Sequence, residues 1–405
     1  MFALLFQYHQ STGRRLLPAL RDITVHLRDF AGLALYPRLV IGRNIRSVTV
    51  KVKSTHEYDE EDWDEEISDG SDHPTQWDNA VAVLVPYASR LTRFEVTRLE
   101  FYRSSESMKD LYHSLRCLTV LKGALGMTHD VFQHLATLPC LESLGCTITS
   151  EELDQADFTG QADFFPCLSH LEIGINDLMA VSRFVQHISS RNLQTVLIRE
   201  DSAASVWDLE MLFDALAVSK SCTDLKELRV LREEGKQNIP SFSHIGSEML
   251  ASLFPLSQLT VLEITIKLSV ALDDEDLQNI VTAWPNLHTL CLGKMPMPPI
   301  PPRVTLEGLL HLTSRLPLKE VGLSVDCTKV LNYAETGSIT PCPTLLSLSL
   351  YGSPILENID HIIAPFTLAF PSLSRLRFGG IHGYYRWKAV ERILEPIMEE
   401  NRSRE

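Results

Sequence analysis

Histidine and cysteine are the side chains that most often carry catalysis or bind metals, and their spacing in this chain favours neither. The chain has 14 histidines, but no two stand three or four residues apart, the spacing that places side chains on one face of a helix. The nearest two, His129 and His134, are five apart and would diverge on a helix. There is no HExxH or G-x-S-x-G motif and no phosphate-binding glycine loop. These patterns predict no enzyme, no metal and no cofactor.

The cysteines are spread along the chain without any CxxC pair. This usage is typical of reduced thiols in the cytoplasm or nucleus. We expect Cys117 and Cys291 to face a partner-binding surface, but a lone thiol without a neighbouring base is usually inert. The eight positions are 117, 140, 146, 167, 222, 291, 327 and 342.

Charge and hydropathy exclude further classes of function. A net charge of −15 argues against a nucleic-acid binder, which needs basic surface to displace counterions. The longest apolar runs, such as "AVAVLVPYA" (80–88), are too short to cross a membrane. The opening "MFALLF" is too short for a secretory leader and lacks a basic start. We therefore expect a cytoplasmic or nuclear protein that binds neither nucleic acid nor membranes.

An acidic insertion lies at about 54–78. Residues 54–89 contain no Lys or Arg, and "HEYDEEDWDEEISDGSDH" (56–73) holds 10 carboxylates. Such a segment is usually a solvated loop, and Trp63 could alternatively anchor a basic partner. The candidate residues are Glu57, Asp59, Glu60, Glu61, Asp62, Trp63, Asp64, Glu65 and Glu66.

A short frame of apolar residues recurs along the chain. "WPNLHTLCL" (284–292) shows it: Leu287, Leu290 and Leu292 follow a Leu-x-x-Leu-x-Leu pattern, and Pro285 precedes it. Apart from one interval of 46 residues, the spacing averages about 28 residues, a period typical of leucine-rich repeats. The frame begins at residues Leu20, Ile45, Leu91, Leu115, Leu141, Leu168, Leu193, Leu225, Leu259, Leu287, Leu318, Leu345 and Leu373.

The frame has a physical reason. Side chains alternate between the two faces of a strand, so Leu290 and Leu292 point to the core while Leu287 anchors the preceding turn. Proline cannot continue a helix and pushes the residue before it towards extended geometry, so Pro285 ends a helix where the strand must begin. Strands are thus expected near 22–26, 47–51, 170–174, 289–293 and 375–379.

The segments between the frames are predicted to be helices. Leu277, Ile280, Val281 and Trp284 form one apolar stripe at helical spacing, and 209–216 repeat it. One such unit cannot bury its own apolar face, but a stack of them forms a continuous core. A solenoid made only of helices is the alternative, yet "LSLSLYG" (346–352) alternates with the period of a strand.

The sequence therefore predicts an α/β leucine-rich-repeat solenoid, a horseshoe with parallel strands on the concave face and helices on the convex face. About thirteen irregular repeats fill residues 16–383. They follow a short N-terminal segment (1–15) and precede a C-terminal capping helix and tail (384–405), in which Val390, Ile393, Leu394, Ile397 and Met398 form an apolar stripe.

Alternate positions of each predicted strand point away from the core and form the candidate protein-binding face. Solenoids present such extended concave faces to partners. Small residues such as Ser347, Ser349 and Gly322 lie between charged ones. The candidate binding residues are Arg93, Glu95, His170, Glu172, Arg199, Glu227, Arg229, Glu263, Glu320, Tyr351, Arg375 and Arg377.

Three stretches together point to a family. "LLPALRDITV" (16–25), "YPRLVIGRNIRSVTV" (36–50) and irregular repeats ending in "FPSLSRLRF" (370–378) resemble the leucine-rich part of fungal F-box/leucine-rich-repeat proteins, particularly those of mushroom-forming fungi. The resemblance covers roughly residues 15–383 in pattern.

The resemblance implies a function. In that family a helical F-box docks onto the adaptor of a cullin-type ubiquitin ligase, and the horseshoe receives the substrate. The roughly fifteen residues before the first repeat do not resemble an F-box, so adaptor binding is not expected of them. Either the chain is a truncated product or it belongs to a branch without an F-box. The alternatives are an F-box-less scaffold and a GTPase-activating or regulatory leucine-rich-repeat protein. "PMPPIPPR" (296–303) also matches the polyproline pattern read by SH3-type domains, or it is a stiff loop.

Overall fold

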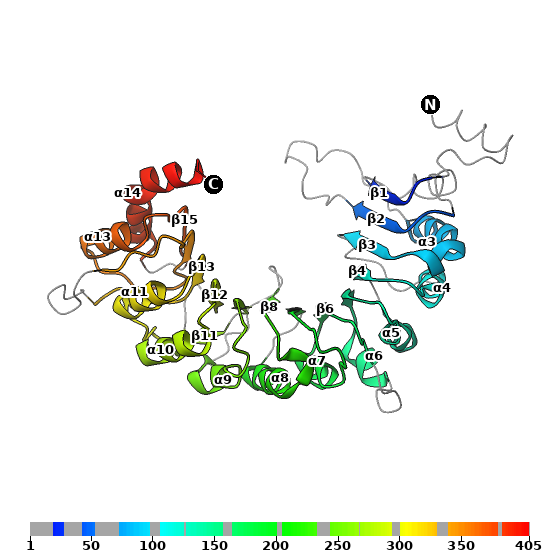
Figure 1. The fold of residues 1–405 in the computed structure, drawn as a ribbon. Helices are drawn as coiled ribbons and strands as arrows, with labels where there is room; N and C mark the ends of the chain where they lie inside the picture. Colours follow the sequence, from blue (N-terminus) through cyan, green and yellow to red (C-terminus); the bar gives the residue numbers. More distant parts are fainter. Residues whose placement is uncertain are drawn as a thin grey trace. The chain divides into compact units, whose positions relative to one another are not determined.

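Most repeats of the sequence fold into one strand followed by one helix in the computed structural model of the chain (Figure 1). The chain divides into two compact units, the first comprising Met1–Ile175 with His187–Asn192 and the second Asn176–Gln186 with Leu193–Glu405. The structure describes residues 19–27, 43–52, 73–97, 106–124, 127–156, 164–200, 205–232, 244–266, 268–293, 300–329, 339–379 and 383–404.

The described part of the first unit contains parallel strands that neighbour one another in chain order. The strands are β1 (Asp22–Leu27), β2 (Ser47–Val52), β3 (Arg93–Thr97), β4 (Val120–Ala124), β5 (Ser143–Thr147) and β6 (His170–Ile175). The helices are α3 (His73–Leu84), the 3-10 helix η2 (Val85–Arg90), α4 (Glu106–Ser114), α5 (His129–Ala136) and α6 (Ser150–Gln155).

The second unit continues the same alternation of strand and helix. Its parallel strands are β7 (Thr195–Glu200), β8 (Glu227–Arg232), β10 (Val261–Thr265), β12 (Thr289–Leu292), β13 (Glu320–Gly322), β14 (Ser347–Ser349) and β15 (Arg375–Arg377). The short strands β9 (His244–Ile245) and β11 (Ser269–Val270) pair separately. The helices are α7 (Leu178–Val185), α8 (Val206–Val218), η3 (Lys220–Cys222), α9 (Ser247–Ala251), α10 (Asp274–Ala283), α11 (Leu306–Arg315), α13 (Asp360–Ala369) and α14 (Tyr384–Arg402).

The fold class predicted from the sequence is confirmed. The protein is α/β, with a 13-stranded parallel sheet whose strands alternate with helices, and this is the leucine-rich-repeat arrangement. Within each unit Figure 1 shows the helices on one side of the strands. We call the opposite side of the sheet the strand face.

The leucine frame forms the core in the predicted way. Leu287, Leu290 and Leu292 are fully buried. Leu290 stands beside Leu262 of β10 and Val321 of β13 in the sheet register. The same frame position therefore stacks from strand to strand. The five strands predicted near 22–26, 47–51, 170–174, 289–293 and 375–379 are all present and parallel.

One frame begins three residues later than the sequence suggested. Leu115 follows α4 and is buried, but it does not anchor a strand. Strand β4 starts at Val120, with Leu118 and Leu121 taking the buried frame positions. The pairing of Val120 with Arg93 of β3 and with Ser143 of β5 sets this later start. Cys117 consequently lies exposed in the turn before β4, and not on the strand face.

The predicted helices begin at capping residues. The Ser205 hydroxyl accepts from the Asp208 N–H while the Asp208 carboxylate accepts from the Ser205 N–H, and Asp273 and Asp276 form the same capping box at α10. Such caps satisfy amide groups that the first helical turn leaves without partners. Between these ends, α8 buries Leu209, Leu212, Phe213 and Leu216, as its apolar stripe predicted.

The last helix, α14, buries a narrower stripe than the sequence indicated. Trp387, Val390, Leu394 and Met398 are buried. Ile393 and Ile397 are 50% and 36% exposed, so these two do not belong to the buried face. Trp387 stacks between Phe366 and Phe378, with ring centroids 6.4 Å from each, and its indole N–H donates to the Ser353 carbonyl. These aromatic contacts hold α14 against the last repeats.

Candidate functional site

The strand face of the second unit brings six of the twelve predicted binding residues into two rows across parallel strands. The sheet register aligns residues in successive strands. The first row runs Glu227, Val261, Thr289, Glu320, Ser347, Arg375, and the second runs Arg229, Glu263, Cys291, Gly322, Ser349, Arg377.

Charge is distributed unevenly along these rows. On the β8 side the Arg229 guanidinium lies 2.6 Å from a Glu263 carboxylate oxygen and 3.8 Å from Glu227. Glu320 is half-buried on β13, and its carboxylate makes no hydrogen bond or ion pair with any described residue. Arg377 is exposed on β15, and its guanidinium likewise has no such partner in the described part of the chain. An unpaired carboxylate and an unpaired guanidinium therefore lie on strands two apart.

Tyr351 lies near enough to both charges to interact with them electrostatically. A Cβ built on Gly322 would be 2.5 Å from the Tyr351 hydroxyl oxygen and 3.1 Å from the Cys291 sulfur. Only glycine leaves room for the phenol to lie this close to the sheet. Tyr351 is half-buried and Cys291 is 4% exposed. We call Tyr351 with Cys291, Gly322, Ser347 and Ser349 the Tyr351 shelf.

Burial changes the acid–base chemistry of the Tyr351 shelf. Burial, with the Cys291 thiol and the Glu263 and Glu320 carboxylates, raises the pKa of Tyr351, and Arg377 opposes the change. Burial, with the same two carboxylates, also raises the pKa of Cys291. Both groups therefore stay neutral at physiological pH. A neutral buried thiol is a poor nucleophile, and Cys291 is on this argument a packing residue.

Ser347 shows the feature that sequence reasoning missed. Alternation placed Ser347 and Ser349 on the outward face, but their exposed fractions are only 6% and 5%. The Ser347 hydroxyl has no hydrogen-bond partner. Leaving a buried polar group without a partner costs about 1–3 kcal/mol. It lies between Glu320 and Arg375 in the first row.

The remaining candidate residues lie on the strands β3, β6 and β7. Arg93 and Glu95 form an ion pair of 3.0 Å on β3. His170 begins β6, and its Nδ1 lies 2.7 Å from the Ser169 hydroxyl. Glu172 follows two residues later on β6, and Arg199 lies on β7. The sequence did not indicate which of the candidate residues lie close together, and the binding face itself stays a prediction.

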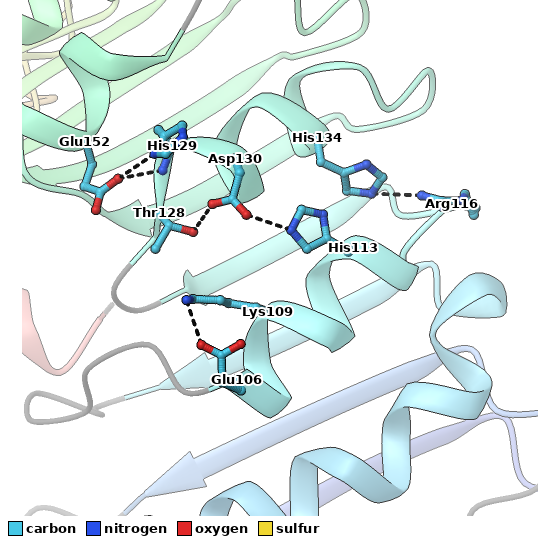
Figure 2. A network of polar contacts seen from close by, with 9 residues as sticks. All are labelled: Glu106, Lys109, His113, Arg116, Thr128, His129, Asp130, His134 and Glu152. Atoms are coloured by element: carbon cyan, nitrogen blue, oxygen red, sulfur yellow. Dashed lines mark hydrogen bonds and ion pairs between the residues drawn. The ribbon is translucent and has the colours of Figure 1, made fainter.

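A second polar cluster lies on the helices of the first unit (Figure 2). The Asp130 carboxylate accepts from the Thr128 hydroxyl and lies 3.1 Å from His113 Nε2. These hydrogen bonds, led by that of Thr128, lower the pKa of Asp130 to about 2, while burial opposes them. His129 Nδ1 lies 3.3 Å from a Glu152 oxygen. The cluster joins α4, α5 and α6 through side chains.

His134 in this cluster faces a donor and an acceptor at once. Its Nε2 lies 3.0 Å from an Arg116 nitrogen and 3.1 Å from the Leu115 carbonyl oxygen. Burial lowers the pKa of His134, the nearby Arg116 and His113 lower it further, and the Leu115 carbonyl opposes them. The neutral ring, with Nε2 accepting from Arg116, is therefore favoured. His129 and His134 diverge, as the five-residue spacing predicted.

Some predicted features lie outside the described residues. The acidic segment 56–73 falls there except for His73, as do residues 296–299 of the proline-rich stretch. Arg303, the arginine of the polyproline pattern, is described, and its guanidinium lies 3.1 Å from an Asp273 carboxylate oxygen. Arg303 is thus engaged with the cap of α10.

Two further properties concern chemistry and membranes. Among the described residues no three His, Cys, Asp or Glu side chains gather as a metal ion would require. No helix in the described ranges is long and apolar enough to span a membrane.

Comparison with known proteins supplies similar structures only. No protein-family model matches the chain, and no curated protein sequence matches it. A chain of the Rad7 and Elc1 complex from yeast is 17% identical, with a TM-score of 0.44 over 73% of this chain and 71% of that chain. At this score the likeness does not indicate what this chain binds.

Two other solved structures are more distant. A protein from Bacteroides fragilis is 10% identical, with a TM-score of 0.32 over 70% of this chain and 66% of that chain. A chain of the Toll–Spatzle complex from Drosophila is 10% identical, with a TM-score of 0.28 over 93% of this chain and 60% of that chain.

Proposed function

We propose that the chain is a non-catalytic recognition module that binds a protein partner on the strand face of the second unit. One observation carries the proposal. Around Tyr351, a carboxylate (Glu320), a guanidinium (Arg377) and a buried hydroxyl (Ser347) have no described partner. Buried polar groups in folded proteins are nearly always hydrogen-bonded, so a group supplied by a second molecule would complete this face.

The chemistry of the face supports binding over catalysis. The thiol and the phenol on the Tyr351 shelf are held neutral, which leaves the face without an activated nucleophile. Tyrosine and arginine are the residues that most often dominate the energy of protein interfaces. A central aromatic side chain with charged groups around it is the arrangement that such interfaces use.

Site-specific photocrosslinking in cells tests this proposal. A photoreactive phenylalanine analogue replaces Thr289, a half-buried residue in the first row of the strand face, or Glu248, an exposed residue of α9 on the helix side. We expect one discrete protein adduct from the Thr289 position and none from Glu248. Adducts only from the helix side, or from neither position, would reject the strand face as the binding surface.

A narrower role follows from the resemblance to fungal F-box/leucine-rich-repeat proteins. We infer that the bound protein is the substrate of a cullin-type ubiquitin ligase, and that the chain acts in the cytoplasm or nucleus. If so, the crosslinked protein accumulates and loses ubiquitin when the gene for this chain is removed. Unchanged abundance and ubiquitination would leave a binding module without the ligase role.

A further inference from the structure

The two ends of the Tyr351 shelf carry opposite charge, and this limits what can bind there. Toward β8 lie the Glu227, Glu263 and Glu320 carboxylates, with Arg229 as the one opposing cation among the row positions. Toward β15 lie the Arg375 and Arg377 guanidiniums. A polyanion such as a nucleic acid would be attracted to one end and repelled by the other.

The spacing of the unpaired charges sets the size of the bound segment. Glu320 and Arg377 lie two strands and two residues apart. With strands about 4.8 Å apart and a rise of about 3.3 Å per residue, their Cα atoms are separated by roughly 12 Å. An extended chain covers that distance in three or four residues, while a helix, at about 1.5 Å per residue, needs about eight.

The shelf between these charges suits an extended chain. Cys291, Gly322 and Ser349 have short side chains, and Tyr351 lies above the glycine as a platform. The Ser347 hydroxyl can donate and accept hydrogen bonds, and so can an extended backbone, because its N–H and C=O groups are not used internally. A helix uses these groups for its own hydrogen bonds and could not supply them.

We propose that the Tyr351 shelf binds an extended segment of the partner protein in which a basic side chain and a carboxylate stand three or four residues apart. The basic side chain pairs with Glu320 and the carboxylate pairs with Arg377. The segment's backbone lies across Tyr351 and hydrogen-bonds to Ser347 when the side chains that cover this hydroxyl turn towards the ligand. This inference rests on the proposed function and adds to it the chemistry of the partner.

Peptide selection against the full 405-residue chain tests the proposal without knowledge of the partner. A phage library of random 12-residue peptides is selected on the wild-type chain and depleted on the Glu320→Arg/Arg377→Glu variant. We expect the enriched peptides to share Lys or Arg and Asp or Glu at a spacing of three or four. Synthetic copies are then measured by fluorescence anisotropy.

Single substitutions show whether both Glu320 and Arg377 contribute to the affinity for the peptide. Glu320→Gln and Arg377→Gln are each expected to weaken a selected peptide about tenfold, which corresponds to about 1.4 kcal/mol. Glu248→Gln on α9 and Arg315→Gln at the end of α11 make the same changes of charge at exposed positions on the helix side. These two control variants are expected to change the affinity less than twofold.

Exchange of the charges gives the sharper test. A selected peptide with its basic and acidic residues exchanged is expected to lose binding to the wild-type chain and to recover it with Glu320→Arg/Arg377→Glu. Circular dichroism of each variant verifies the fold. A variant that fails to fold is replaced by Glu320→Gln/Arg377→Gln, which is expected to bind neither peptide.

The other outcomes overturn the inference in distinguishable ways. Peptides with charges about eight residues apart, or with one charge only, that still require Glu320 or Arg377 would disprove the extended dipolar segment and leave strand-face binding intact. Peptides indifferent to every strand-face variant, together with no adduct at Thr289, would remove the proposed function as well. No enriched peptide at all would also count against the inference, because the shelf would then not bind a short segment.

Discussion

At the scale of single residues, the structure makes two ionisation equilibria part of the folding equilibrium. Tyr351 and Asp130 each experience surroundings that the unfolded chain lacks, so their pKa values differ between the two states. By linkage, the free energy of unfolding must then depend on pH wherever the two states bind different numbers of protons. Tyr351 is expected to affect the free energy of unfolding at alkaline pH, and Asp130 at acid pH.

Tyr351 is expected to make the second unit sensitive to alkali. Its pKa is raised in the folded state, so its contribution is complete below the unfolded value of about 10 and is lost as pH rises through the folded value. We expect wild type to lose more stability than Tyr351→Phe between about pH 9.5 and 11. Urea unfolding at several pH values measures this, and parallel losses in the two proteins would contradict it.

Asp130 is expected to make the stability of the first unit depend on pH under acid conditions. Its folded pKa of about 2 lies below its ordinary value of 3.8, so its contribution is complete above about pH 4 and is lost as pH falls through about 2. Asp130 is half exposed, and solvent screening reduces the effect to less than about 1 kcal/mol. Melting temperatures at pH 5 and 2.5 should differ less in Asp130→Asn than in wild type.

Asp110→Asn is the matched control for this measurement. Asp110 is an exposed carboxylate on α4, and the same substitution there is expected to leave the difference between pH 5 and 2.5 as in wild type. A smaller difference in both variants would show that general charge, and not the bonds of Asp130 to Thr128 and His113, sets the acid response.

At the scale of single elements, adjacent residues of one short strand are expected to differ sharply. Leu348 is fully buried against the helices, whereas Ser347 is buried on the strand face with an unpaired hydroxyl. Leu348→Ala should cost about 2–5 kcal/mol through a cavity. Ser347→Ala should cost nothing or stabilise slightly, because it removes a polar group without a partner. Urea unfolding compares them, and a large cost at Ser347 would show that its hydroxyl is satisfied.

The start of α10 is joined to the start of α11 by one carboxylate. Asp274 accepts from the Thr305 N–H at 2.8 Å and from the Thr305 hydroxyl at 2.7 Å, and Gly308 leaves room for it. Asp274→Ala should cost about 1–3 kcal/mol, since two donors lose their acceptor. Glu275→Ala, one residue along and exposed, should cost under about 0.5 kcal/mol. Similar costs at both positions would mean that only the helix dipole matters.

At the scale of the whole molecule, the stability of a repeat array is the sum of the stabilities of its repeats and of the interfaces between neighbouring repeats. A destabilising substitution at one end should therefore affect distant repeats less than near ones. Trp387 is 1% exposed and packs between Phe366 and Phe378. Trp387→Ala should cost about 3–5 kcal/mol locally. Amide exchange is expected to quicken most in β14 and β15 and little in the first unit. Equal loss of protection in both units would instead indicate one cooperative transition.

The sequence alone determined the architecture, because the leucine frame is a local pattern. Alternation along a strand decides which side chains face the core, and it placed Leu290 correctly with no knowledge of its neighbours. Caps and prolines are local in the same way, so the helices of the second unit were predictable. At Leu115 and Leu118 the local pattern fits the frame twice, and the pairing of β4 with its neighbouring strands shows that the repeat starts at Leu118.

The tertiary structure decided which residues meet. Glu320, Tyr351 and Arg377 are separated by 31 and 26 positions in the chain, and the register of three strands brings them together. The role of Gly322, which leaves space for the Tyr351 phenol, became recognisable only when the structure placed Tyr351 against it. The burial of Ser347 and the contact of His113 with Asp130 arise in the same way. They depend on distances between repeats, which no single repeat of the sequence contains.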